Sequence, residues 1–427
     1  MNEIAQKYGD PWIWGIYFML ILISIIESYT ASSRVISVQG VYTPVIKQCM
    51  FLGVGGVFVF FLYRMDYNKP KFLYIMIPGL AIFTLFTLAY VMGWGLMING
   101  ARRAMRLLPG VTLQPAELAK LSIVTLLSYI LAKNQKNLDI SNTGLVLSVI
   151  AVSVYGGLMI RSGLTNTILL MAISLAMMLI AGIRMKKFAI LILVYGVVGL
   201  GYLGLKRHND SVDRSLAEAG VEQVKDAGDR SETRKNRIED WLDNLTNLVD
   251  QPVTTKNQQV MFSRMAQAHG GMFGAGLGQS RECSRLPLAF SDYIYSIIVE
   301  ETGFVGGVFV LVLYLWLLAR AAMIVRRSTR VMPSLLVIGM ASFITFQALF
   351  HMAINVGLFP VSGQPLPLIS AGGSSIIVMS VAFGVMFSVS RTIANYNNRN
   401  NKEDTTVLPD GLDAVNPTQI PPKHVWK

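Results

Sequence analysis

Residues 291–319 read SDYIYSIIVEETGFVGGVFVLVLYLWLLA. From Tyr293 onward the stretch is apolar except for one pair of glutamates, and it is long enough to cross a hydrocarbon core of about 30 Å as a helix. Asp292 stands at its start, where the one long polar loop of the chain returns to the membrane. A carboxylate at such a boundary has water on one side and low-dielectric surroundings on the other, so it can be tuned to accept a proton. The stretch therefore predicts a membrane span that begins beside a candidate general base.

Composition extends this prediction to the whole chain. Of its 427 residues, 53% are hydrophobic and 15% are charged, and the mean hydropathy is +0.49, which is too apolar for a soluble protein of this length. Each span must be a helix, because an open strand in lipid would leave its backbone groups without hydrogen bonds. We predict an all-α polytopic membrane protein with ten transmembrane helices and a large extracytoplasmic loop between helices 7 and 8. The predicted spans are residues 12–31, 45–63, 72–95, 118–132, 143–160, 164–183, 188–205, 293–319, 333–357 and 374–390.

Basic residues set the predicted orientation. Lys and Arg gather in alternate short loops, which the positive-inside rule places in the cytoplasm together with both termini. The predicted domains are a membrane domain of residues 1–391, which contains the extracytoplasmic loop 206–291, and a disordered cytoplasmic tail of residues 392–427. Within the loop, residues 234–249 carry apolar side chains at helical spacing and are predicted to lie on the membrane surface. The net charge of +12 indicates contact with anionic membrane lipids and not with nucleic acid.

Charged residues cluster where the third span ends and the fourth begins. Arg102, Arg103 and Arg106 lie on the extracytoplasmic side, where the positive-inside rule disfavours basic residues, and this indicates a bound anion. The alternative is that the three arginines have no ligand and are tolerated there because neighbouring segments hold their short loop in place. Glu117 and Lys120 share one face of the fourth span at i, i+3 spacing. A lysine inside the membrane is costly enough to need a function or a partner. The pair is therefore either a self-neutralising structural pair or part of a binding site.

A glycine-rich run, residues 270–278, leads along the loop towards Asp292. Its glycines let the backbone approach another group closely, and Gln259 and Ser263 precede it. Two turns beyond Asp292, the adjacent pair Glu300-Glu301 cannot both face lipid, so we expect at least one to point to a polar cavity or a basic partner. The alternative for this pair is a role in helix packing.

Residues 359–375 read FPVSGQPLPLISAGGSS and join the last two spans. Three prolines and three glycines among small polar residues predict a rigid re-entrant loop, which is allowed at membrane depth only where it lines protein or water. We expect this loop to form a stiff wall beside the helix that follows Asp292. The sequence has no phosphate-binding glycine motif and no Cys/His cluster that would indicate a metal site.

Five ordered motifs of the chain resemble those of the SEDS family (shape, elongation, division and sporulation), which comprises the FtsW, RodA and SpoVE peptidoglycan polymerases. They are NGARR at 99–103, QPAELAK at 114–120, GMFGAGLGQS at 271–280, LPLAFSDYIY at 286–295 and PVSGQPLPLISAGGSS at 360–375. The resemblance covers about residues 12–391. One departure follows the fifth span, where the family usually has Pro-Asp-Leu-Gly-Thr and this chain has Ser162-Gly163-Leu164-Thr165-Asn166, without the acidic residue.

The resemblance implies an enzyme that joins lipid II units into glycan strands. The 4-hydroxyl of the acceptor attacks the anomeric carbon of the donor, and undecaprenyl pyrophosphate leaves with inversion. Asp292 is the implied general base, and cationic side chains would offset the charge of the pyrophosphate, with Mg²⁺ or Mn²⁺ as a possible cofactor. The implied substrate-binding residues are Arg102, Arg103, Glu117, Lys120, Gln259, Ser263, Gly276, Gln364, Ser370, Gly372, Gly373 and Ser374.

The implied setting is the bacterial cytoplasmic membrane, at the division septum. The implied partners are lipid II and nascent glycan, a class B penicillin-binding protein (the transpeptidase), other membrane proteins of the division machinery, and membrane lipids. The long external loop, the tail and the ISAGGSS form of the last motif favour a division-type member (FtsW) over an elongation-type member (RodA).

Two interpretations from other functional classes stay open. The first is a flippase for lipid-linked precursors. Two observations speak against it: the charged motifs all lie on one side of the membrane, and no inverted repeat is visible. The second is a noncatalytic scaffold of the division machinery, which is favoured if the altered Ser162-Gly163 site is a lesion.

Overall fold

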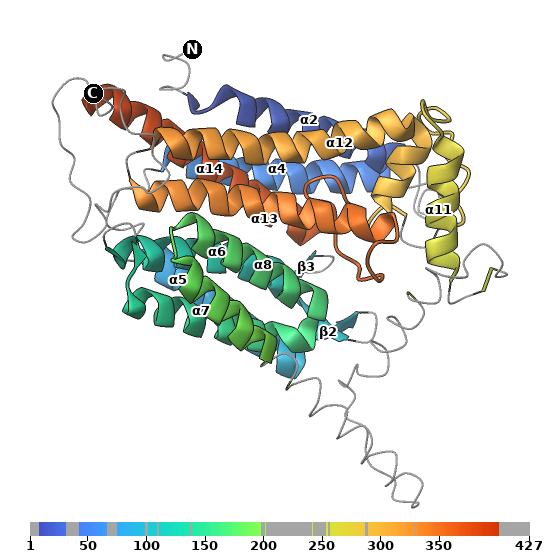
Figure 1. Ribbon diagram of the computed structural model, residues 1–427. Coiled ribbons are helices and arrows are strands. Elements are labelled where there is room, and N and C mark those ends of the chain that lie inside the picture. The colour runs from blue at the N-terminus through green and yellow to red at the C-terminus, as the bar shows by residue number, and fades with distance from the viewer. Residues whose placement is uncertain are drawn as a thin grey trace, which may run out of the picture.

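The structure, a computed structural model, describes residues 8–30, 42–65, 75–98, 101–108, 111–136, 139–197, 257–286, 289–328 and 330–400, together with 201, 241, 253 and 254. Figure 1 shows the arrangement of its elements. The helices are α2 (Pro11–Thr30), α4 (Thr43–Arg64), α5 (Ile77–Trp94), α6 (Pro115–Lys133), α7 (Asn142–Ser162), α8 (Leu164–Ile180), α11 (Gln258–Gly270), α12 (Ile294–Arg327), α13 (Val331–Asn355) and α14 (Gly373–Asn400). The strands are β1 (Leu96–Ile98), β2 (Ala101–Leu108), β3 (Val111–Leu113), β4 (Gln135–Lys136) and β5 (Asp139–Ile140).

The described helices confirm an all-α polytopic membrane protein. Eight of them are long and apolar enough to cross a membrane, and α8 is a shorter apolar helix at the position of the sixth predicted span. At the seventh predicted span, residues 185–197 are helical, and most of the remainder of that span lies outside the described residues. The structure thus follows the predicted order of spans as far as it describes the chain.

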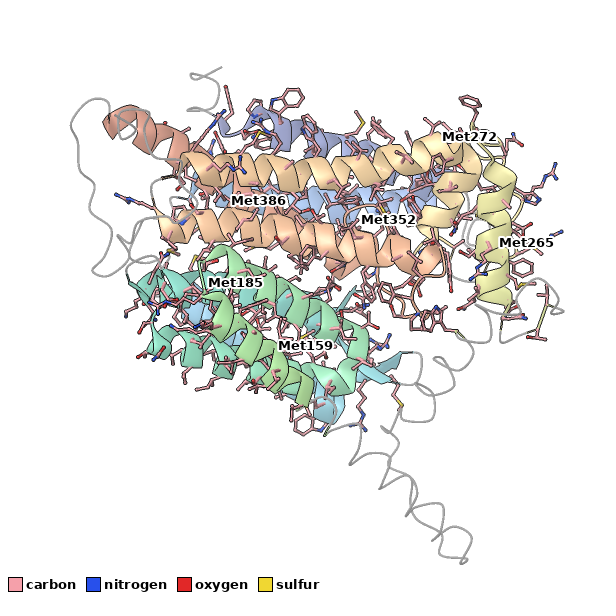
Figure 2. All side chains as sticks on the ribbon, in the orientation of Figure 1. Met159, Met185, Met265, Met272, Met352 and Met386 are labelled. Atoms are coloured by element: carbon pink, nitrogen blue, oxygen red, sulfur yellow. The ribbon has the colours of Figure 1, made fainter. Side chains whose placement is uncertain are left out.

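The helices form two groups that meet along α13. One group holds α2, α4, α12, α13 and α14, the other holds α5 to α8, and α13 packs against both α6 and α8 (Figure 1). In α6, α13 and α14, 78%, 83% and 78% of the most apolar window is buried inside the protein, against 22–39% in the other membrane-spanning candidates. These three helices therefore form the centre of the bundle, and the others expose apolar faces suited to lipid. Figure 2 shows Met352 and Met386, both buried, among the side chains that fill the space between the helices.

A small antiparallel sheet, β1-β2-β3, follows α5 and was not predicted. The strands β1 and β2 flank Asn99-Gly100, a dipeptide that favours two-residue hairpins. The strands β2 and β3 flank Pro109-Gly110, another turn signal. The sequence therefore carried the hairpin signals, but the arginines of this loop were interpreted by charge alone.

Helix α12 departs from its predicted span in length and shape. It runs to Arg327 over 34 residues, and it breaks at Gly303, whose φ of 75° and ψ of −176° are not helical. The short segment Ile294–Thr302 turns across the end of the bundle beside α11, at the same end as the loop between α13 and α14 (Figure 1). Asp292 directly precedes this short segment.

Two predictions about the polar regions fall partly outside the described residues. The amphipathic run 234–249 is described only at Trp241, which is half-buried. Helix α14 continues to Asn400, so it extends past the predicted start of the tail at residue 392. Thr392 supports this extension by donating its hydroxyl hydrogen bond to the Ser388 carbonyl one turn earlier.

Candidate active site

Asp292 and the re-entrant loop are in direct contact. The glycine at 363 has a φ of +66°, and a Cβ placed on it would lie 3.1 Å from Asp292 Oδ2, so bare loop backbone faces the carboxylate. The Ser291 hydroxyl donates to Asp292 Oδ1 at 3.1 Å. The Ser370 hydroxyl donates to the Ser291 carbonyl at 2.7 Å. The loop is therefore the wall beside Asp292 that the sequence predicted.

The rest of the loop is held by buried hydrogen bonds. Gln347 Nε2 donates to the Pro365 carbonyl at 3.2 Å, and Tyr314 donates to the Pro367 carbonyl at 2.7 Å. The Leu366 amide donates to Ser370 Oγ at 2.7 Å. Leu368 has a φ of 64°, a conformation that costs a non-glycine residue about 1–3 kcal/mol and persists where the surroundings enforce it. The loop is thus rigid, and its shape is fixed by the helices around it.

Glu117 and Lys120 form the ion pair that their spacing predicted. Lys120 Nζ lies 2.8 Å from Glu117 Oε1 and 2.6 Å from Gln347 Oε1, and the lysine side chain has no exposed surface. This is the arrangement of the structural-pair alternative, in which the ammonium is already satisfied by two oxygens. Gln347 also links this ion pair to the re-entrant loop, because its Nε2 donates a hydrogen bond to the Pro365 carbonyl. A contact between Lys120 and substrate stays a prediction that requires this pair to open.

Arg102 and Arg103 point in different directions because they are neighbours on strand β2, where successive side chains alternate between faces. Arg102 is exposed and donates to the carbonyls of Met92, at 3.2 Å, and Gly93, at the end of α5. Arg103 is half-buried, and its Nη2 lies 3.7 Å from the position of a Cβ added at Gly163. The two arginines therefore have different surroundings in this arrangement, and their contact with a substrate stays a prediction. Arg103 instead faces the junction of α7 and α8 where the chain departs from the family motif.

The glycine-rich run packs against the break in α12. A Cβ at Gly270 would lie 2.0 Å from the Val299 carbonyl oxygen, and a Cβ at Gly274 would lie 2.2 Å from that of Glu301. A Cβ at Gly303 would lie 2.4 Å from the Met272 carbonyl oxygen. The close approach that the glycines predicted is therefore an approach to α12. Gly276, predicted to bind substrate, donates its amide to the Glu301 carbonyl at 3.0 Å as part of this contact.

Helix α11 places two of the predicted residues near Asp292. Gln259 Oε1 accepts a hydrogen bond from the Tyr293 hydroxyl at 3.5 Å. Ser263 is buried and its hydroxyl lies 2.7 Å from that of Ser296 on α12. Their side chains thus support the start of α12, and contact with a substrate stays a prediction.

Both glutamates beyond Asp292 are buried inside the protein. Glu300 accepts hydrogen bonds from the Ser280 hydroxyl at 2.5 Å and from the Arg281 amide at 2.9 Å. Glu301 has both carboxylate oxygens buried without a hydrogen bond. Within the described ranges, no group of three or more His, Cys, Asp or Glu side chains is placed to hold a metal ion.

The remaining predicted residues lie at the two ends of the loop. Gln364 is 4% exposed, and its carbonyl oxygen lies 2.6 Å from His351 Nδ1. Ser374 Oγ accepts from the Gln114 amide at 3.3 Å, which joins α14 to the start of α6. A Cβ at Gly373 would lie 2.5 Å from the Phe51 ring, whereas one at Gly372 would meet nothing closer than 3.5 Å.

Three polar residues on one face of α13 were missed in the sequence. Gln347, His351 and Asn355 follow one another at intervals of four, and each bonds the loop or the backbone of Asp292. Polar side chains repeated at helical spacing in an otherwise apolar span are a signal of a lined site. That signal was present in the sequence and was overlooked because no member of the set carries a fixed charge.

Comparison with known proteins places this arrangement among its relatives. A family model described as "Cell cycle protein", which is named for FtsW, RodA and SpoVE, matches residues 11–395. Stage V sporulation protein E of Bacillus subtilis (strain 168) is 30% identical over 352 residues, which are 81% of this chain and 86% of that protein. A probable peptidoglycan glycosyltransferase FtsW of Trichlorobacter lovleyi is 28% identical over 347 residues, or 81% of this chain and 82% of that one.

Solved structures share the fold. One, described as a peptidoglycan synthase complex that coordinates polymerization and crosslinking, matches with a TM-score of 0.63 and 23% identity over 90% of this chain and 98% of that chain. The rod shape determining protein RodA of Thermus thermophilus matches with a TM-score of 0.59 and 21% identity over 90% of this chain and 97% of that chain. At these identities the likeness concerns the fold.

Proposed function

Because the chain belongs to the FtsW, RodA and SpoVE family of cell-cycle proteins, we propose that it is a peptidoglycan glycosyltransferase that polymerises lipid II. The curated relatives named as probable peptidoglycan glycosyltransferases support this activity. The observation that carries the proposal is Asp292, which stands at the start of a membrane helix with its carboxylate against the re-entrant loop. This is a fixed carboxylate at the boundary between membrane and water, where a lipid-linked sugar would arrive.

In the proposed reaction, Asp292 takes the proton of the acceptor 4-hydroxyl. The hydroxyl oxygen forms a bond to the anomeric carbon of the donor, and the bond from that carbon to the pyrophosphate oxygen breaks, so undecaprenyl pyrophosphate leaves with the electron pair. A positioned base commonly contributes about 10²- to 10⁴-fold to such a step. Cations near the leaving group add electrostatic stabilisation, which Arg103, Lys120 or a bound divalent ion would supply.

The polar face of α13 gives this site a hydrogen-bonded setting. Gln347 and His351 hold the loop from one side, and the loop backbone then faces Asp292 without side-chain bulk at Gly363. A wall that does not have to reorganise during the reaction is what electrostatic stabilisation requires. This rigidity favours a catalytic role over that of a noncatalytic scaffold.

We propose the division-type role within the family, with a class B penicillin-binding protein as partner and the septum as its place. The FtsW relatives support the role, and the solved synthase complex supports such a partner. Both termini and the short basic loops would lie in the cytoplasm. Depletion in the native bacterium distinguishes the family roles: filaments indicate division, rounded cells indicate elongation, and normal growth with a block in spore formation indicates a sporulation role.

The test of the activity uses the purified protein with its partner transpeptidase and fluorescent lipid II. Wild type should form glycan polymer, and Asp292→Asn should form none while keeping expression and partner binding. Asp139→Asn makes the same chemical change at the opposite end of the bundle and should keep activity. Polymer at wild-type intensity from Asp292→Asn would refute the general base, and transfer of lipid II across vesicles without polymer would favour the flippase.

A further inference from the structure

Asn355, the last residue of α13, is a hydrogen-bond hub directly behind Asp292. It is 2% exposed, and all of its polar side-chain positions are used. Its Nδ2 donates to the Asp292 carbonyl at 3.1 Å and to the His351 carbonyl at 2.9 Å. Its Oδ1 accepts from the Ser296 amide at 3.3 Å and the Ser296 hydroxyl at 2.9 Å. One side chain thus holds the backbone on both sides of the start of α12.

The bond to Ser296 adds a cap-like acceptor from another helix to the first turn of α12. The residue at the N-cap position of α12 is Tyr293, whose side chain makes no capping hydrogen bond. An asparagine oxygen on the third amide of a helix is the usual N-cap contact, and its loss commonly costs about 0.5–2 kcal/mol. Here the contact comes from α13, about 60 positions away in the sequence, and it is a second acceptor for the Ser296 amide, which also donates to the Tyr293 carbonyl at 3.0 Å.

The backbone of Asn355 extends the hub to α11. Its carbonyl accepts from the Ser263 hydroxyl at 3.0 Å and from Gln267 Nε2 at 2.8 Å. The opposite side of the same segment is held by the loop, through Ser370 on the Ser291 carbonyl and the Ala371 amide on the Phe290 carbonyl at 3.0 Å. The segment before α12 is therefore clamped from two sides.

We propose that Asn355 is a positioning residue, which fixes the height and direction of the Asp292 carboxylate through its bonds to the Asp292 carbonyl and to the first turn of α12. This inference rests on the proposed glycosyltransferase activity for its effect on turnover. A carboxylate displaced by about 1 Å from the reacting hydroxyl can lose about 10²-fold in rate. Asn355 itself stays behind the backbone and does not need to touch the sugar.

The test compares Asn355→Leu with Asn134→Leu. Asn134 is a matched control, because it also follows the last turn of a helix and donates Nδ2 to the carbonyl four residues earlier, at 2.8 Å, but at the other end of the bundle. Asn355→Leu should lower kcat for lipid II about 10- to 100-fold with KM changed less than about threefold. Asn134→Leu should leave both constants within about twofold.

A second readout does not depend on activity. Hydrogen–deuterium exchange of residues 290–297 should be faster in Asn355→Leu and unchanged in Asn134→Leu. Asn355→Asp keeps the acceptor to Ser296 but removes the donors to the Asp292 and His351 carbonyls and buries a charge, so it should lose turnover, and its Tm must be measured beside its kcat. Unchanged exchange in folded Asn355→Leu, or equal losses of kcat in the two leucine variants, would overturn the proposal. If wild type forms no polymer, the proposed activity fails, while the exchange measurement still decides whether Asn355 holds this segment.

Discussion

At Lys120 an ammonium group is buried without exposed surface and is held by Glu117 and Gln347. Removing one partner of such a buried pair commonly costs about 3–5 kcal/mol, because the other charge is left without compensation. Replacing both charged partners together can leave the stability of the folded protein nearly unchanged. The pair therefore allows its structural role to be separated from a role in binding pyrophosphate.

Lys120→Met should lower both thermal stability and polymerisation, because Glu117 is left unpaired in the interior. The double variant Glu117→Gln/Lys120→Met should recover most of the stability but not the turnover or the retention of lipid II. Arg106→Ala, an exposed position on β2, serves as the control and should change little. Recovery of full activity in the double variant would return Glu117 and Lys120 to a purely structural role.

Gly373 and Gly372 are adjacent but differ in the space around them. A methyl group at 373 would enter the ring of Phe51 on α4, whereas one at 372 has ordinary contact distances. We expect Gly373→Ala to lower activity by shifting the end of the re-entrant loop, and Gly372→Ala to be tolerated. Polymerisation rates of the two purified variants, with partner binding as a check on folding, measure the difference.

The elements show why part of the site could not be predicted. Glu117 and Lys120 were correctly paired because helical spacing alone brings them together. Arg102 and Arg103 were grouped by charge alone because the loop was not recognised as a strand, in which neighbours face opposite sides. The contribution of Asn355 depends on a contact between distant helices, which no local pattern encodes.

The glycine contact between α11 and the break in α12 gives a test at this scale. Gly270→Ala places a methyl group against the backbone of Val299, where no side chain can move aside. Overpacking of this kind typically costs about 1–3 kcal/mol. We expect a lower Tm for Gly270→Ala, measured by thermal unfolding in detergent.

Gly157→Ala provides the matched control within α7. A Cβ at Gly157 would meet nothing within 4 Å, and alanine is the better helix former, so its Tm should be unchanged or slightly raised. Equal Tm values for the two variants would contradict the close backbone contact between α11 and α12.

Across the whole molecule, carboxylates lie against basic side chains at both ends of the bundle. At the end away from the site, Asp139 pairs with Arg184 at 2.8 Å and Lys187 at 3.0 Å, and Asp10 pairs with Arg320. At the site end, Glu117 pairs with Lys120, and Glu300 lies 3.6 Å from His269 Nδ1 in addition to its hydroxyl and amide donors. Hydropathy predicted the bundle as a whole, because each span needs apolar faces, but it could not predict which partner each of these carboxylates takes.

The Asp139 pairs make the stability of the whole bundle depend on pH. Burial acts to raise the pKa of Asp139, but hydrogen bonds from Lys187 and the Ile140 amide, with the charges of Lys187 and Arg184, outweigh it and hold the pKa below its ordinary value. A group with a lowered pKa stabilises the folded state above its unfolded pKa of about 3.9, and this stabilisation is lost as the pH falls through the folded value.

Asp139→Asn should therefore lower Tm by a similar amount from about pH 8 to pH 5, and the difference from wild type should shrink below about pH 4. Thermal unfolding of both proteins across this range measures it. A difference that instead grew at low pH would show that Asp139 does not act through these ion pairs.

The break at Gly303 also relates the protein to the thickness of the bilayer. The straight part of α12 from Phe304 to Arg327 has a length of about 36 Å, which matches a hydrocarbon core of about 30 Å with a modest tilt, whereas the unbroken helix would be about 51 Å long. The bend thus marks the level at which the chain leaves the acyl region, and Asp292 is held a fixed number of residues above it. A thinner bilayer would be accommodated by a larger tilt of α12. A bilayer too thick for α12 to span would instead lower the carboxylate relative to the headgroups, so the acyl-chain length of the surrounding lipid becomes a determinant of where the sugar meets its base.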